Sequence, residues 1–123
     1  MPTKVTIHSV TDGAICIGDK IYRQTIALTA DKVFDEWAGK AVTQLTEADF
    51  LPLLENNIEV IVLGTGPGNI LPHRDLVFAL ARRGIGLEFM DTPAAARTFN
   101  VLVGEGRSVA AVLYIGPGKQ EPA

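Results

Sequence analysis

One stretch decides the fold of this chain: residues 58–70, with the sequence IEVIVLGTGPGNI. Five of its first six residues are apolar, and a glycine-rich loop follows immediately. Such a run predicts a strand over 58–63 that is buried on both faces, as in the interior of a parallel sheet. Residues 71–83 have helical character. The glycines therefore form a strand-to-helix turn at the carboxyl edge of a sheet, where α/β proteins place ligands.

The remainder of the second half repeats this order of strand and helix. Residues 85–90 predict another buried strand. A helix capped by Thr92 follows, and residues 108–115 predict the last strand, parallel by default. Right-handed crossovers place the first two strands side by side and parallel. The loops after these strands, 64–70 and 91–92, should then emerge at the same edge of the sheet and share one crevice.

The amino-terminal half predicts a different kind of structure. Residues 3–30 alternate in the manner of strands, with turns at Asp12-Gly13 and Gly18-Asp19 and a last run over 20–29. This pattern indicates an antiparallel β meander.

Two further features precede the organising stretch. Residues 47–55 predict a short or broken helix with Thr46 as N-cap, because Pro52 lacks a backbone donor. Trp37 is expected to pack over the edge of the core rather than to bind a partner.

Length and composition indicate one globular domain over residues 1–123, with an ordered core over 3–116 and a frayed tail over 117–123. A net charge of −3 gives no electrostatic reason to expect nucleic acid or an acidic membrane surface as a partner. The chain has no apolar run long enough to span a bilayer and no signal-peptide core. We therefore expect a protein of the cytoplasm, most simply of a bacterium.

The glycine loop only superficially resembles a phosphate-binding loop. Asn69 stands where a dinucleotide fingerprint needs its third glycine, no lysine follows, and Pro67 has no N–H to offer a phosphate. A tight turn with positive φ is the favoured interpretation, and binding of an anion or small ligand is the alternative.

Other polar residues near this edge have structural explanations too. Asp91 and Thr92 can cap the following helix without any ligand. Thr98 and Asn100 lie in the middle of an otherwise apolar helix. Asn is a poor helix former, so we expect a polar partner to hold it, more often backbone in a neighbouring loop than a substrate. The candidate ligand-binding residues are Gly64, Thr65, Gly66, Gly68, Asn69, Asp91, Thr92, Thr98 and Asn100.

No catalytic set can be assembled from the sequence. His73 and Asp75 start the helix over 71–83 without an activated nucleophile, which favours a solvated face over a general-base site. Cys16 is the only cysteine, and the two histidines lie far apart, so neither a disulfide nor a metal site is expected. We expect no cofactor, and enzymatic activity stays open, with a non-enzyme favoured.

Several short motifs occur in a characteristic order and spacing. They are Gly18-Asp19-Lys20-Ile21-Tyr22, Trp37, Leu45-Thr46-Glu47-Ala48-Asp49-Phe50, Gly64-Thr65-Gly66, Arg83-Gly84-Ile85, Asp91-Thr92-Pro93 and Thr98-Phe99-Asn100. The set resembles the small bacterial and archaeal family of unknown function, with the Mth938-like fold, that includes mitochondrial complex I assembly factor three. The resemblance covers residues 5–116. Each motif is weak alone, but the ordered set is fairly specific.

The resemblance implies a three-layer α/β fold. Its central mixed sheet would have five strands, with flanking helices and with the last strand antiparallel to the rest. The family has no established enzymatic activity, and its mitochondrial member acts in assembling respiratory complex I. Relatives often carry a cysteine where this chain has Ala96, so thiol chemistry at that position is not available here.

Two functional hypotheses follow. The first is a non-enzymatic interaction or assembly factor with one or more protein partners. The second is a small-ligand or anion-binding domain, with enzymatic activity left open, that uses the crevice at 64–70 and Asp91-Thr92. The sequence also leaves a homo-oligomer open.

Overall fold

The structure of the chain is a computed structural model that describes residues 5–11, 13–35, 37, 39–55 and 57–115. The expected frayed tail over 117–123 lies outside these residues, as do Asp12 of the first predicted turn and the first residues of the expected ordered core. None of the helices within the described ranges combines the length and the apolar character needed to cross a bilayer.

Strand β6 (Val60–Thr65) lies in the interior of the main sheet, between β8 (Val109–Tyr114) and β7 (Gly86–Met90), and is parallel to both. Every residue of β6 and of β8 is buried, which confirms the strand predicted from the apolar run. The strand begins two residues later than predicted, at Val60 rather than 58. It continues through Gly64 and Thr65 because both still pair with β8.

Two antiparallel strands complete this sheet beyond β8. Strand β4 (Ile26–Thr29) is antiparallel to β8, and β5 (Val33–Phe34) is antiparallel to β4. The strand order is β5-β4-β8-β6-β7, which confirms the α/β class and the mixed five-stranded sheet.

The direction of the last strand is a correction to the expectation drawn from the resemblance. Strand β8 is parallel to β6, whereas an antiparallel last strand was expected. Helix α3 (Thr92–Gly104) carries the chain from the carboxyl end of β7 back across the sheet, so the next strand runs in the same direction as β7. Strand β4 runs opposite to β6, β7 and β8, and β5, which is antiparallel to β4, runs in the same direction as those three strands.

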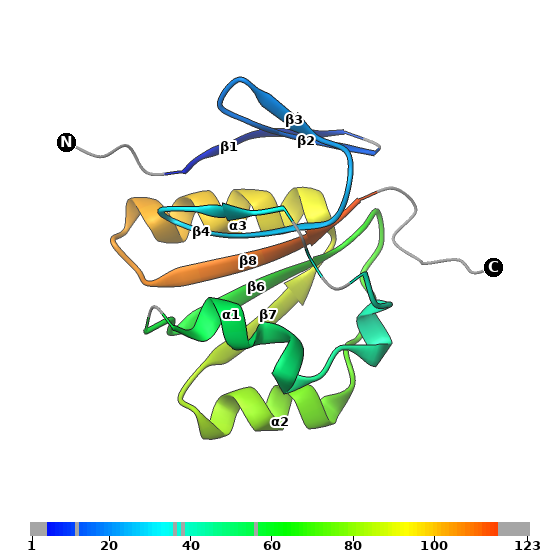
Figure 1. Ribbon diagram of the computed structural model, residues 1–123, viewed down its shortest axis with the longest axis vertical. Helices are drawn as coiled ribbons and strands as arrows, with labels where there is room; N and C mark the ends of the chain where they lie inside the picture. The colour runs from blue at the N-terminus through cyan, green and yellow to red at the C-terminus, as the bar shows by residue number, and fades with distance from the viewer. Residues whose placement is uncertain (1–4, 12, 36, 38, 56, 116–123) are drawn as a thin grey trace.

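Helical segments cover both faces of this sheet, which confirms the three layers (Figure 1). Along β6, Val60 and Val62 pack into a cluster with α3, whereas Ile61 and Leu63 pack into a cluster on the opposite face. This is the alternation of side chains that a strand buried on both sides requires. The opposite face is covered by the 3-10 turns η1 (Val42–Gln44) and η2 (Glu47–Phe50) and by helices α1 (Leu51–Leu54) and α2 (Arg74–Arg82).

The helix boundaries follow from local capping. Helix α2 begins three residues later than predicted, at Arg74, because His73 is its N-cap and accepts a hydrogen bond at Nδ1 from the Asp75 N–H at 3.1 Å. Gly84 ends the helix in the left-handed region, with φ +79°.

The short helix predicted over 47–55 is present as η2 followed directly by α1. Thr46 is its N-cap, and the Thr46 N–H donates to the Asp49 carboxylate at 2.9 Å. Pro52 lies in the first turn of α1, where a missing N–H removes no helical hydrogen bond.

The amino-terminal strands β1 (Ile7–Thr11), β2 (Ala14–Ile17) and β3 (Lys20–Tyr22) form the predicted antiparallel meander. The run over 20–29, however, is two strands rather than one. Exposed polar residues follow β3, and the chain then enters the main sheet as β4. Inward-facing residues of the meander share a cluster with α3, so the meander lies against that helix (Figure 1).

Candidate functional site

The two loops predicted to share one sheet edge lie side by side and are joined directly. The Thr92 N–H donates to the Gly66 C=O at 2.7 Å, and the Gly66 N–H donates to Thr92 Oγ1 at 2.8 Å. This reciprocal pair bridges the end of β6 and the start of α3. The prediction that the loops after β6 and β7 meet is confirmed.

Thr92 is buried, and its hydroxyl has both a donor and an acceptor partner. Besides accepting from Gly66, Oγ1 donates to the Tyr114 C=O at 2.5 Å. Asp91, rather than Thr92, is the N-cap of α3, since Asp91 Oδ1 accepts from the Ala94 N–H at 2.8 Å. The sequence prediction of Thr92 as cap was therefore wrong, because tertiary hydrogen bonds hold its side chain inside the sheet edge.

The first turn of α3 has little free hydrogen-bonding capacity. The Ala94 N–H binds the Asp91 carboxylate, the Ala95 N–H binds the Asp91 C=O, and Pro93 has no N–H. A helix N-terminus usually offers several unsatisfied donors to an anion. Here the protein itself satisfies those donors.

Thr65 organises the glycine loop from inside. Its Oγ1 accepts from the Ile70 N–H at 3.0 Å, and it lies within donating distance of the C=O groups of Gly68 (2.5 Å) and Met90 (3.2 Å). Gly66 has φ +99°, as the favoured interpretation of a tight glycine turn requires. The loop is thus held by its own side chain and by the neighbouring strand.

The polar residues farther along α3 face other partners. Thr98 Oγ1 donates to Met90 Sδ at 3.4 Å. Asn100 binds the backbone of Ile7 in β1 at both polar atoms, with Oδ1 accepting from N–H at 3.0 Å and Nδ2 donating to C=O at 2.8 Å. Its partner is backbone, as the sequence favoured, but the partner lies in a strand rather than in a loop.

Two cavities adjoin this edge of the sheet. The first, of about 180 Å³, is lined by Val10, Thr11, Gly66, Pro67, Thr92, Pro93, Tyr114 and Ile115. The second, of about 270 Å³, is lined by Ile7, His8, Ser9, Val10, Pro93, Ala96, Arg97 and Asn100. Of the candidate residues, Gly66 and Thr92 line the first cavity and Asn100 lines the second. The remaining six, which line neither, are Gly64, Thr65, Gly68, Asn69, Asp91 and Thr98.

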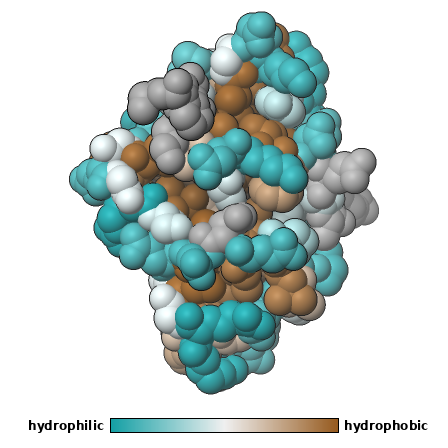
Figure 2. All heavy atoms as spheres, turned by 60° about the vertical axis from the view of Figure 1, so that its left-hand side comes forward, coloured by the Kyte–Doolittle hydropathy of each residue, from teal (hydrophilic) through white to brown (hydrophobic). Residues whose placement is uncertain are grey.

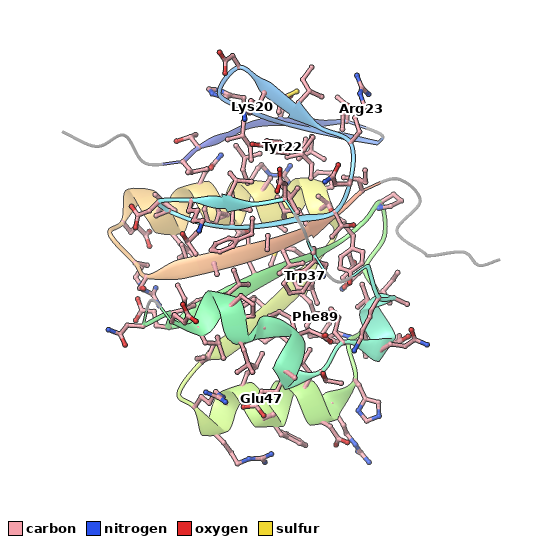
Figure 3. The ribbon with its side chains drawn as sticks, viewed as in Figure 1. Lys20, Tyr22, Arg23, Trp37, Glu47 and Phe89 are labelled. Carbon is pink, nitrogen blue, oxygen red and sulfur yellow. The ribbon has the colours of Figure 1, made fainter. Side chains whose placement is uncertain are left out.

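A wider groove, of about 480 Å³, lies between the η1–η2 segment and α2, where sequence reasoning placed no site. It contains His73 and Asp75, which had been interpreted as a solvated face. Glu47 lines the groove (Figure 3). Its carboxylate binds Arg83, which follows α2. The only sequence signal was the group of charges in the first turn of the helix, which does not reveal a groove.

The amino-terminal edge of the parallel strands lies opposite the edge with the predicted crevice. On the face brought forward in Figure 2, apolar residues gather in the middle and polar residues surround them. An ion pair between Arg107 and Glu59, at 2.8 Å, lies at this edge, and a cavity of about 210 Å³ is lined in part by Arg107. Hydrogen bonding from Arg107 lowers the pKa of Glu59. Both side chains are exposed to solvent, so this pair contributes little to stability.

Trp37 packs as the sequence predicted. Trp37 lies over the cluster on the α2 side of the sheet (Figure 3). Its ring meets that of Phe50 edge to face, with centroids 5.3 Å apart. Across the described ranges, His, Cys, Asp and Glu side chains do not gather in a group of three that could hold a metal ion.

Comparison with known proteins identifies a family of proteins that this chain matches and relatives that are similar to it in sequence. A family model described as a protein of unknown function (DUF498/DUF598) matches residues 7–114. The mouse protein named NADH dehydrogenase [ubiquinone] 1 alpha subcomplex assembly factor 3 is 34% identical over 121 residues, which cover 96% of this chain and 64% of the mouse protein. The chain therefore spans slightly less than two thirds of that relative.

Solved structures show the same architecture. A Xanthomonas campestris protein solved by NMR has a TM-score of 0.83 and 34% identity, over 96% of this chain and 89% of its own. A Bordetella pertussis protein described as a Mth938-like domain has a TM-score of 0.76 and 25% identity, over 95% of this chain and 88% of its own. With the family model matching almost all of the described residues, the chain belongs to the DUF498/DUF598 family of proteins of unknown function and has the Mth938-like fold.

Proposed function

We propose that this protein is a non-enzymatic assembly factor that binds a partner protein during the biogenesis of a respiratory or other membrane complex, and that it acts in the cytoplasm. The observation that carries the proposal is the 34% identity to the mouse assembly factor over 96% of this chain. An alignment over nearly the whole chain supports a common origin of the two domains.

The hydrogen bonds at the carboxyl edge of the parallel strands support the binding of a partner rather than catalysis. The hydroxyls of Thr65 and Thr92 and the carboxylate of Asp91 all hold the protein's own backbone. A catalytic group needs a side chain free to meet a substrate atom. These three side chains serve instead to make the edge rigid, and a rigid surface lowers the entropy cost of binding a partner.

Exposed apolar side chains on α2 and just before it also fit the binding of a partner protein. Phe78 of α2 is 55% exposed and Leu71, just before α2, is 68% exposed. Phe78 lies on the side of α2 away from the buried Leu76 and Leu80. Aromatic residues are enriched in protein interfaces, where they supply large contact areas.

Deleting the gene in the organism that encodes the chain tests this proposal. The expected result is a lower amount of the assembled membrane-bound NADH dehydrogenase complex on native gels, with partly assembled forms accumulating. The wild-type chain should restore the complex. A Phe78→Ser variant should restore less of it than an Asp75→Ser control, which changes another exposed residue of α2. An unchanged amount of the complex after deletion would contradict the respiratory assignment.

A second candidate is the binding of a small ligand or anion at the predicted crevice. The cavity of about 180 Å³, which Gly66 and Thr92 help to line, favours it. Of the candidate set Gly64, Thr65, Gly66, Gly68, Asn69, Asp91, Thr92, Thr98 and Asn100, a ligand in this cavity would contact Gly66 and Thr92. A thermal-shift screen of nucleotides, phosphates and metabolites tests this, because a ligand at 100 times its Kd stabilises by about 2.7 kcal/mol. No shift across a broad panel would refute it.

A further inference from the structure

The two cavities at the sheet edge share two of their lining residues. Both are lined by Val10 of β1 and by Pro93 of α3, so they adjoin along the line where β1 lies beside α3. We call this hollow the β1–α3 groove. It consists of the residues that line the two cavities, with Ile115 at one end and Asn100 at the other.

One wall of the groove is the outer edge of a β-sheet. Strand β1 is the first strand in the order β1-β2-β3, so alternate peptide groups along it point away from β2. At Ile7 these groups are bound by Asn100, whose side-chain amide supplies one donor and one acceptor as a peptide group does. Next to Val10 and Thr11, the part of the chain that the structure describes places no strand against this edge. The edge is thus paired at one end and open at the other.

The two ends of the groove have different chemistry. The smaller cavity presents aliphatic surface from Val10, Pro67, Pro93 and Ile115. The larger cavity adds polar groups, among them the side chain of Arg97. Arg97 is exposed and forms no hydrogen bond or ion pair with any residue that the structure describes. The groove therefore matches an aliphatic group next to a negative charge.

We propose that the β1–α3 groove binds an extended segment of the partner protein as an added strand on the outer edge of β1. An aliphatic side chain of this segment enters the cavity at Pro67 and Ile115, and a carboxylate meets Arg97. Backbone hydrogen bonds supply affinity in such strand addition, and alternate side chains supply specificity. The inference rests on the proposed function and names the chemistry of its partner. An isolated anion fits less well, because the first turn of α3 already has its donors satisfied.

Selection from a random heptapeptide library against the full chain tests the proposal. Wild-type protein is expected to enrich peptides with a Val, Ile or Leu two positions from an Asp or Glu, since side chains two apart lie on the same face of a strand. An Arg97→Glu variant should enrich Lys or Arg in place of the acid. An Arg82→Glu variant, which changes an exposed arginine on the distant helix α2, should enrich the wild-type pattern. No enrichment, or the same acidic pattern with Arg97→Glu, would overturn the proposal.

Binding of the enriched peptide to isotope-labelled protein locates the site. The amide signals of Val10, Thr11 and Gly66 should shift, and Arg97→Glu should weaken binding at least tenfold while its unperturbed spectrum shows an intact fold. Shifts confined to α2 would overturn the assignment.

The other possible occupant of the groove is the protein's own segment 116–123. A truncated chain that ends at Ile115 tests this alternative. If truncation alone shifts the groove signals and tightens peptide binding at least tenfold, the tail occupies the groove and a partner segment is refuted as the primary occupant. Equal affinity of both chains supports the partner. If the peptide tests fail while the deletion strain still shows an assembly defect, binding of a partner segment in the groove is refuted. The proposed function would then remain supported.

Discussion

The side-chain amide of Asn100 binds Ile7 at both backbone polar atoms, across 93 residues of sequence. The contact joins the middle of α3 to the first strand of the meander, next to the β1–α3 groove. The Asn100 side chain thus occupies the place beside Ile7 where a neighbouring strand would form its backbone hydrogen bonds. Together with the apolar packing of the meander on α3, this contact helps to hold β1 in place.

Replacing Asn100 with Ala should therefore destabilise the protein. The change leaves the N–H and C=O of buried Ile7 without partners, and unsatisfied buried groups cost about 1–3 kcal/mol. We expect the free energy of unfolding in urea to fall by about 2 kcal/mol. Hydrogen exchange at the Ile7 amide should become faster. The control is Asn69→Ala, which changes an exposed loop residue and should stay within about 0.5 kcal/mol. Equal stability of the two variants would refute this role.

Gly64 of β6 lies against the first turn of α3. A Cβ at this position would lie 2.8 Å from Thr92 Oγ1 and 2.9 Å from Thr92 Cα, both too close for unstrained contact. Gly64→Ala should thus lower the free energy of unfolding by about 1–3 kcal/mol through overpacking. Gly68→Ala is the matched control, because a Cβ there meets nothing within 4 Å. A Gly64→Ala protein as stable as the control would show that α3 can move without cost.

The buried hydroxyl of Thr92 can be tested by an isosteric change. Thr92→Val keeps the shape but removes the acceptor for the Gly66 N–H and the donor to the Tyr114 C=O. We expect a loss of about 2 kcal/mol in urea unfolding, because two buried backbone groups lose their partners. Thr92→Ser keeps the hydroxyl and removes only a methyl group, so it should cost about 1 kcal/mol. A Val variant more stable than the Ser variant would contradict the hydrogen-bonding role.

Local patterns predicted the elements of this fold better than their long-range relationships. The apolar run at 58–63 identified a buried strand because burial on both faces leaves its mark in consecutive residues. The strand–helix–strand order correctly favoured a β8 parallel to β6. The resemblance led instead to the expectation of an antiparallel last strand, which was wrong. The division of 20–29 between two sheets could not be read locally, since both parts have strand character.

The candidate site was predictable in its location and not in its internal bonding. Consecutive βα loops had to meet at one edge, so the proximity of Gly66 and Thr92 followed from topology. That Thr92 binds Gly66 and Tyr114 instead of capping α3 depends on partners 26 and 22 residues away. The groove beside β1 was also missed, because the meander shows in sequence only its alternation and not the helix it lies against.

Tyr114, at the end of β8, is fully buried within the cluster on the α2 side of the sheet. Its hydroxyl donates to the Lys40 C=O at 2.6 Å. Burial raises the pKa of Tyr114 to about 12. Trp37 opposes this rise, and the negative charge of Asp49 adds to it with a weaker effect. The phenol is therefore kept neutral in the native state over a range of pH where an exposed tyrosine ionises.

This difference predicts a loss of stability in alkaline solution. Below the ordinary tyrosine pKa of 10.0, the phenol is neutral in both states, and its contribution is fully present. As pH rises from 10.0 towards about 12, the unfolded chain loses the proton first, so unfolding becomes more favourable. Wild type should lose about 1 kcal/mol more than Tyr114→Phe between pH 8 and pH 11 in urea unfolding. Parallel pH profiles for the two proteins would show that Tyr114 ionises as readily in the native state as in the unfolded chain.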